Sequence, residues 1–265
     1  MQVCQHLRQV RASACDATAA GGIIGVPDIR FERQADGMSW DQAVRTVTPH
    51  IVKIETPDGY GTGFLAFWNH DRSGCGIATA AHVVKHADYW QLPIKIGAQG
   101  QPPLLLQGAD RIILLDAATD SAVVLFFKRE LQLPDVPIAL LPMSEPRSIG
   151  VAVAWLGYPD LEPNALCFFS GTVSHHLAAR NAYLIDGVAL NGVSGGPVFY
   201  VLSSGAVQII GSVSAYYHAN RSTLPGLLVA QGLSHFHEVA GHLRSLDEAH
   251  AAKREFEAAQ RQRHG

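Results

Sequence analysis

The 265-residue sequence has few cysteines, few charged side chains and no long apolar segment. Its four cysteines, Cys4, Cys15, Cys75 and Cys167, do not have the dense spacing of a disulfide framework, so we expect reduced thiols. No apolar run reaches the roughly 18 residues of a transmembrane helix. The first residues lack the apolar stretch of a signal peptide. We therefore expect a cytoplasmic protein that does not enter a membrane.

An excess of basic side chains is also lacking, because 20 Lys and Arg residues face 23 Asp and Glu residues. A nucleic-acid partner is therefore not expected. We find no phosphate-binding loop, dinucleotide fingerprint or zinc spacing, so no cofactor is predicted. The chain has 13 histidines, but neighbours such as His235 and His237 would lie on different faces of a helix. We predict no metal site.

The sequence does contain many short apolar runs separated by Gly, Pro and Asp turns, which is typical of an antiparallel barrel or sandwich. The predicted strands are 51–54, 63–67, 76–79, 94–96, 112–115, 122–126, 151–156, 167–174, 183–186, 197–202, 207–214 and 227–230. They form two groups, which gives an N-terminal arm (1–45), a first β domain (46–128), a proline-rich connector (129–149), a second β domain (150–232) and a C-terminal helix (233–265). Within the arm, a short helix is predicted over 39–44 with Ser39 as its cap.

The segment Asn191-Gly192-Val193-Ser194-Gly195-Gly196-Pro197 presents a serine between glycines. Glycine permits positive φ and a close approach of another backbone, so neighbouring N–H groups can converge on one point. Such a point would be an oxyanion hole beside a nucleophilic serine. The alternative is a glycine-rich turn with a solvated serine.

A serine nucleophile needs a base and a group that orients the base. The base is predicted in Thr79-Ala80-Ala81-His82, where an apolar strand runs into small residues and then a histidine at a bend. The orienting carboxylate is predicted in Asp120-Ser121-Ala122-Val123-Val124, where Asp120 comes directly before a buried strand. An unpaired carboxylate there would be costly, and a histidine N–H is a suitable partner. Asp116 is the alternative to Asp120.

These three blocks resemble the signature sequences of the chymotrypsin-like (trypsin-fold) serine proteases, in the same order along the chain. Four further segments, 61–65, 156–159, 170–174 and 210–214, are similar to the bacterial branch related to the high-temperature-requirement, or Deg-type, proteases. The resemblance runs from about Ile51 to about Gln231. It implies an all-β fold of two six-stranded antiparallel Greek-key β-barrels, with the active site in the crevice between them. We expect no PDZ-type peptide-binding domain.

The resemblance also implies a function, a serine endopeptidase that forms an acyl-enzyme with a polypeptide substrate. Ser194 would be the nucleophile, His82 the general base and then acid, and Asp120 the orienting group. The N–H groups of Gly192 and Ser194 would form the oxyanion hole. Ser214 resembles the residue that hydrogen-bonds the aspartate of the triad.

Two positions depart from the family pattern. Val193 stands before the nucleophile, where digestive members have an aspartate that pairs with a newly cut N-terminus and bacterial members usually have asparagine. Activation by that ion pair is therefore excluded, and a valine side chain cannot hold the loop by a hydrogen bond. Val83 follows the histidine, where many secreted members have a cysteine.

The substrate pocket is predicted from the same resemblance to involve Val188 at its floor, with Ser214 and Tyr216 beside it. Since Val188 is not a carboxylate, cleavage after Arg or Lys is not expected. We predict a preference for small or medium apolar side chains at the cleavage position.

Three other interpretations stay open at this point. The sequence Gly192-Val193-Ser194-Gly195-Gly196 also fits the nucleophile elbow of α/β-hydrolases, but a strand-forming segment follows it instead of a helix. A protease-fold module that binds peptides without turnover, and an esterase on the same scaffold, would both contain the same residues. The N-terminal arm or the C-terminal helix could bind a partner protein.

Overall fold

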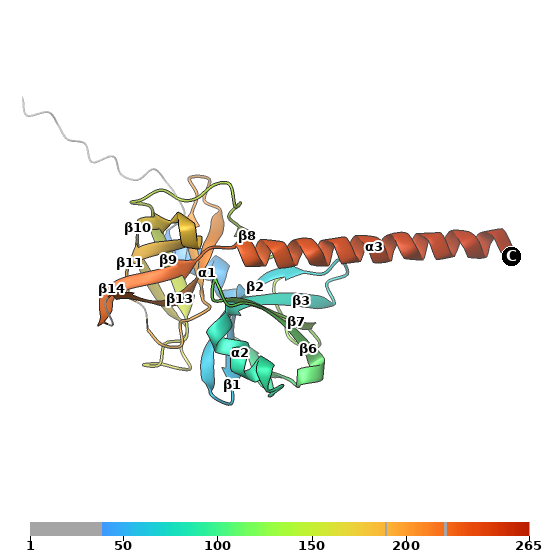
Figure 1. Cartoon of the computed structure of the whole chain (residues 1–265), viewed down its shortest axis with the longest axis horizontal. Helices are drawn as coiled ribbons and strands as arrows, with labels where there is room; N and C mark the ends of the chain where they lie inside the picture. Colours follow the sequence, from blue (N-terminus) through green and yellow to red (C-terminus); the bar gives the residue numbers. More distant parts are fainter. Residues whose placement is uncertain (1–38, 189, 220–221, 265) are drawn as a thin grey trace, which may run out of the picture. The chain divides into compact units, whose positions relative to one another are not determined.

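A computed structural model describes residues 39–188, 190–219 and 222–264, with only the backbone described at 215–219, 222–225, 258 and 262–264. Its architecture is mostly β, with two antiparallel sheets and three α-helices in these residues (Figure 1). The helices are α1 (Trp40–Val47), α2 (Ala81–Tyr89) and α3 (Ser234–His264). Short 3-10 turns lie at Thr48–His50, Gly108–Asp110 and Ala178–Arg180.

The first sheet contains β1 (Ile51–Thr56), β2 (Gly59–Trp68), β3 (Gly74–Ala80), β4 (Ile94–Ala98), β5 (Leu104–Leu106), β6 (Arg111–Asp116) and β7 (Ser121–Phe127). The strand order is β5-β4-β1-β2-β3-β7-β6, and every pairing is antiparallel. Its edge strands β5 and β6 are bridged by a side chain, because Arg111 Nη1 donates to the carbonyl of Leu106 (3.1 Å).

The second sheet contains β8 (Ala139–Leu140), β9 (Ala152–Gly157), β10 (Cys167–Leu177), β11 (Ala182–Asp186), β12 (Pro197–Val201), β13 (Val207–Ala219) and β14 (Ser222–Gln231). Strands β9 to β14 follow one another in the order β12-β9-β10-β11-β14-β13, and β12 also pairs with β13, so these six strands close into a barrel. The short β8 pairs in parallel with β13. The predicted fold class is confirmed, with seven strands in each sheet where six were predicted.

The larger hydrophobic core contains side chains from both sheets. Phe64 and Val123 of the first sheet belong to the same buried cluster as Trp155 and Val198 of the second. A smaller cluster, which includes Ile77, fills the first sheet against α2. Because side chains alternate between the two faces of a strand, Phe64 and Ala66 of β2 belong to the larger cluster and Leu65 between them belongs to the smaller one.

Helix α1 begins where the sequence predicted, because Ser39 Oγ accepts from Gln42 N and the Gln42 side chain accepts from Ser39 N in a capping box. Helix α3 begins within the core and contacts both sheets. His235 Nε2 donates to the carbonyl of Leu114 in β6 (3.0 Å), and His237 Nε2 donates to the carbonyl of Leu141 after β8 (2.8 Å). The predicted C-terminal helix is therefore present, and its first turns are part of the packed structure.

Candidate active site

His82 is the second residue of α2, directly after β3. The sequence predicted a bend here, and the structure has the first turn of a helix. The N–H groups at a helix start lack partners within the helix. Asp120 supplies them, because its Oδ1 accepts from His82 N (2.9 Å) and its carbonyl accepts from Ala81 N (2.9 Å). The same carboxylate that contacts the ring therefore also fixes the backbone of His82.

Asp120 lies at the end of the turn that joins β6 to β7, with a left-handed φ of +48°. Its Oδ2 accepts from His82 Nδ1 (2.8 Å) and from Ser214 Oγ (2.6 Å). Burial acts to raise the pKa of Asp120, but the hydrogen bonds from His82 and Ser214 and the charge of His82 outweigh it, so the pKa lies below its ordinary 3.8. The carboxylate is therefore ionised and held from both sheets.

Asp116, the alternative to Asp120, has a different role in the turn. Its carboxylate accepts from Thr119 Oγ1 (2.6 Å) and from Ala118 N (2.9 Å), which closes the turn before Asp120. The hydrogen bond from Thr119 is the largest influence on the pKa of Asp116 and lowers it. No hydrogen bond in the described residues joins Asp116 to His82. The structure therefore brings Asp120, and not Asp116, to the histidine.

Ser194 lies in the loop before β12 and is half-buried. Its Oγ donates to the carbonyl of Ser214 at 3.4 Å, which is near the limit for a hydrogen bond. Among the hydrogen bonds of the described residues, none joins Ser194 Oγ to the ring of His82. The structure thus gathers His82, Asp120, Ser214 and Ser194 into one cluster, with the serine hydroxyl turned toward Ser214 in this state.

The loop around Ser194 contains two backbone N–H groups without an acceptor among the described residues. Gly192 and Gly195 have φ of +83° and +84°, which glycine adopts without a steric cost. The carbonyls of Asn191 and Val193 accept from Asp160 N (2.9 Å) and Gly196 N (2.9 Å). In a planar trans peptide the N–H points away from its carbonyl. The N–H groups of Gly192 and Ser194 therefore point away from these donors, and neither donates to an acceptor among the described residues.

Val193 is completely buried and belongs to the core shared by the two sheets. It packs on Gly157 at the end of β9, where an added Cβ would lie 2.7 Å from Val193 Cγ1. The valine thus fixes its part of the loop by packing, in the place where the family pattern has a polar side chain.

The predicted pocket residues are only partly assembled. Ser214 hydrogen-bonds Asp120 and therefore belongs to the cluster. Val188 is 53% exposed, so it does not form a buried floor, and its neighbour at position 189 lies outside the described residues. Tyr216 has its backbone in β13, but its side chain is outside the described part of the structure. The assignment of the pocket stays a prediction.

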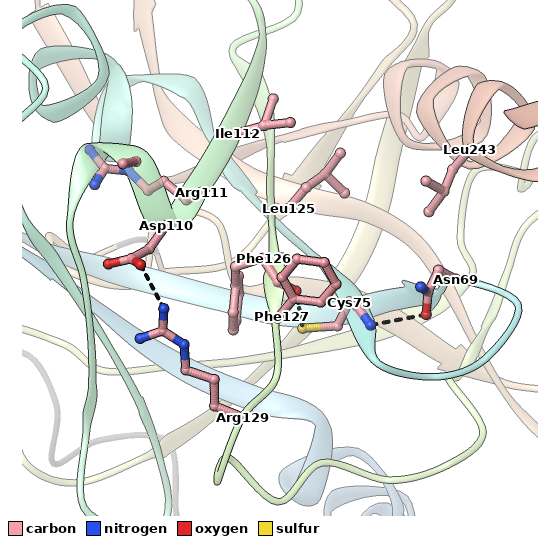
Figure 2. A pocket seen from close by; sticks show the side chains of 12 residues that line it. Asn69, Cys75, Asp110, Arg111, Ile112, Leu125, Phe126, Phe127, Arg129 and Leu243 are labelled. Atoms are coloured by element: carbon pink, nitrogen blue, oxygen red, sulfur yellow. Dashed lines mark hydrogen bonds and ion pairs between the residues drawn. The ribbon is translucent and has the colours of Figure 1, made fainter. Parts of the chain in front are cut away.

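A cavity of about 370 Å³ lies elsewhere, against the outer strands of the first sheet (Figure 2). Its polar groups bind one another, because Arg129 Nη2 donates to Asp110 Oδ1 (2.6 Å) and Asn69 Oδ1 accepts from Gly74 N (2.9 Å). Burial raises the pKa of the Cys75 thiol to about 12, so the thiol stays protonated. His82, Asp120 and Ser194 do not line this cavity.

None of the helices formed by the described residues combines the length and the apolar character that a membrane-spanning helix needs.

The paired antiparallel sheets and the His–Asp–Ser cluster between them define a serine protease of the trypsin-like class. The family model of the trypsin-like peptidase domain matches residues 61–207, and the chain belongs to this family. The match includes the blocks around His82, Asp120 and Ser194.

Solved structures show the same fold at low sequence identity. The inactive form of the Rv3671c protease of M. tuberculosis H37Rv is 22% identical, with a TM-score of 0.52 over 76% of this chain and 90% of that one. The serine endoprotease from Yersinia pestis is 21% identical, with a TM-score of 0.55 over 78% of this chain and 66% of that one. No curated protein sequence matches this chain significantly.

Sequence reasoning missed one residue that contacts the loop around Ser194. Thr62 lies in the segment 61–65, which was singled out only for its resemblance to the family, yet its hydroxyl donates to the carbonyl of Gly192 (2.8 Å). The available signal was a polar residue between two glycines in an otherwise apolar strand. Its partner is 130 positions away in the chain, so the sequence alone does not identify the contact.

Proposed function

We propose that this protein is a serine endopeptidase that hydrolyses peptide bonds through Ser194, His82 and Asp120. The observation that carries the proposal is the hydrogen bond from His82 Nδ1 to Asp120 Oδ2 (2.8 Å). It keeps the proton on Nδ1 and leaves Nε2 as the acceptor, which is the tautomer that a general base needs. His82 is 40% exposed, so a substrate can reach it.

In the proposed reaction, His82 Nε2 takes the proton of Ser194 as Oγ attacks the scissile carbonyl carbon. The negative oxygen of the tetrahedral intermediate is stabilised by the N–H groups of Gly192 and Ser194. His82 then gives the proton to the leaving amine, and the C–N bond breaks to leave an ester on Ser194. Water attacks that ester by the same steps and releases the acid.

The serine must turn from Ser214 to His82 before the first step. Its present hydrogen bond is long at 3.4 Å, so leaving it costs little. Asp120 stays in place during the turn, because Ser214 Oγ and two groups of His82 hold its carboxylate.

A preference for small or medium apolar side chains at the cleavage position is part of the proposal. It rests on the family resemblance, by which position 188 carries Val188 and no carboxylate to bind a basic side chain. A library of peptides that vary at this position tests it. Cleavage dominated by Arg or Lys would contradict the preference.

The activity itself is tested with a fluorophosphonate probe and with unfolded casein. The wild type should react with the probe and cleave casein, Ser194→Ala should do neither, and Ser204→Ala, at an exposed turn, should behave as the wild type. Labelling with hydrolysis of simple esters but not of casein would identify an esterase. A folded wild type that neither labels nor cleaves would identify a binding module.

A further inference from the structure

Thr62 joins the first sheet to the loop around Ser194 through both its backbone and its side chain. Its N–H donates to the carbonyl of Ser194 (2.8 Å), and its Oγ1 donates to the carbonyl of Gly192 (2.8 Å). The residue is completely buried, so water does not compete for these hydrogen bonds. Thr62 belongs to β2, whereas the loop belongs to the second sheet.

The direction of the Thr62 hydroxyl is fixed by a second contact. Tyr158 N donates to Oγ1 at 3.1 Å, so the hydroxyl oxygen already accepts there. Its one hydrogen is then directed to the carbonyl of Gly192. The carbonyl of Thr62 accepts from Thr79 Oγ1 (2.7 Å), which fixes the threonine itself.

Thr62 binds two peptide groups of the loop, and each of them directly follows a peptide group that carries a donor of the predicted oxyanion hole. The hole donors belong to the peptides 191–192 and 193–194, and Thr62 binds the carbonyls of the peptides 192–193 and 194–195. Because each peptide is planar, a fixed carbonyl also fixes the N–H on its other side. That N–H donates from Val193 to the carbonyl of Leu190 (3.2 Å), and from Gly195 to that of Val213 (2.6 Å).

An anchor is needed at this point of the loop. Gly192 has φ of +83° and, as glycine, has access to other backbone conformations at little cost. A turn of the peptide 191–192 would move the N–H of Gly192 out of the hole and bring the carbonyl oxygen of Asn191 toward the space meant for the negative oxygen of the intermediate. The side chain of Val193 contacts the core by packing, and a packing contact does not select one direction of a peptide.

We propose that the Thr62 hydroxyl is a positioning group that keeps the oxyanion hole formed before substrate binds. It does so by fixing the peptide 192–193, which limits how far the preceding peptide 191–192, with the N–H of Gly192, can turn out of the hole. The inference rests on the proposed peptidase function and adds to it a residue that does not touch the reacting atoms.

The test compares Thr62→Val, which keeps the shape and removes the hydroxyl, with Thr62→Ser, which keeps the hydroxyl. Loss of one hole donor lowers kcat by about 10²–10³-fold, and an indirect loss of position should lower it by about tenfold or more. KM should stay within about twofold, because the ground state does not depend on the hole. Thr62→Ser should keep most of the wild-type kcat.

The variant Tyr183→Phe is the control that distinguishes an effect on catalysis from a general loss of stability. This variant also removes a buried hydroxyl, one that accepts from Arg147 N (3.2 Å) away from the loop, and it should lower stability without changing kcat. If Thr62→Val does not fold, Thr62→Cys replaces the hydroxyl with a weak donor of similar position and should show the same loss of kcat.

The outcomes distinguish this inference from the proposed function. A wild type without peptidase activity and without fluorophosphonate labelling overturns the function. An active wild type whose kcat is shared by folded Thr62→Val or Thr62→Cys overturns the role of Thr62 alone. A loss of kcat in Thr62→Ser equal to that in Thr62→Val would also overturn it.

Discussion

At Gly192 both the backbone conformation and the surrounding atoms leave no room for a side chain. Its φ is +83°, and an added Cβ would collide with the carbonyl oxygen of Tyr158 and lie 2.7 Å from Tyr60 Cε2. Gly192→Ala should therefore displace the loop and lower kcat by about 10²-fold or more, the scale of a lost oxyanion donor. Steady-state kinetics on a peptide substrate measure this change.

The matched control for that substitution is Gly150→Ala. Gly150 has a similar φ of +89°, but nothing lies within 4 Å of an added Cβ. Both variants should lose about 1–2 kcal/mol of stability from the left-handed backbone. Only Gly192→Ala should lose activity, and equal activity in the two variants would show that the loop tolerates the displacement.

Asp120 should make the stability of the folded protein depend on pH in the acid range. Its pKa is lower in the folded chain than its ordinary 3.8, so the folded state binds fewer protons than the unfolded state as the pH falls. Its contribution to stability is therefore fully present above the unfolded pKa and is lost as the pH falls through the folded pKa. The difference in unfolding free energy between the wild type and Asp120→Asn should shrink steadily below about pH 5.

Urea denaturation at a series of pH values measures that difference. Asp135→Asn is the control, because the Asp135 side chain is 72% exposed and 3.7 Å from Arg72. This control should follow the wild type at every pH. A difference for Asp120→Asn that stays constant down to the acid limit would contradict the lowered pKa.

At the scale of elements, the first sheet depends on Arg111 to join parts that no strand pairing connects. Its guanidinium donates to the carbonyls of Leu106 in β5 (3.1 Å), Ala87 in α2 (3.1 Å) and Leu92 shortly after α2 (2.6 Å). Burial lowers the pKa of Arg111, but a guanidinium remains charged at any ordinary pH. The backbone carbonyls therefore act as its acceptors in place of a carboxylate.

Arg111→Met should lower the free energy of unfolding by about 2–4 kcal/mol, since three hydrogen bonds to a charged group are lost. Arg129→Met is the comparison, because Arg129 is 48% exposed and forms a surface ion pair with Asp110. Its loss should cost at most about 1 kcal/mol. Denaturant titrations of the two variants compare these costs, and similar values would mean that Arg111 does not join the edges.

Most of the elements could be predicted from local sequence. The apolar runs at 76–79 and 122–126 correspond to β3 and β7, and Ser39 caps α1 as its sequence indicates. The two-residue β8 and the helix after β3 were not predicted. The helix begins at Ala81 without a side-chain cap from Ala80, because Asp120 supplies the acceptors from far along the chain. A local pattern does not contain that information.

At the scale of the whole molecule, the details of the site also depend on contacts that local sequence does not predict. The order and residue types of the three blocks predicted His82, Asp120 and Ser194, and the structure joins His82 to Asp120 by a hydrogen bond while Ser194 Oγ donates to Ser214. The state of the serine hydroxyl and the anchor of the loop could not be predicted, since they depend on Ser214 and Thr62, which come from different sheets. Contacts between the sheets arise only when the complete fold is formed.

The shared core predicts that both sheets unfold together, although the chain exceeds the usual size of a single cooperative unit. Phe236 of α3 is completely buried in this core, with its ring centroid 5.9 Å from that of Phe64 in an edge-to-face contact. Phe236→Ala should lower the free energy of unfolding by about 3–5 kcal/mol. It should also move the transitions seen by tryptophan fluorescence and by far-UV circular dichroism to the same lower urea concentration.

Phe256→Ala, on the same helix but 64% exposed, is the control and should change the free energy of unfolding by less than about 0.5 kcal/mol. Separate transitions in the two signals for Phe236→Ala would show that the sheets are independent, and the bonds between Thr62 and the loop around Ser194 would then join two units that can part without unfolding.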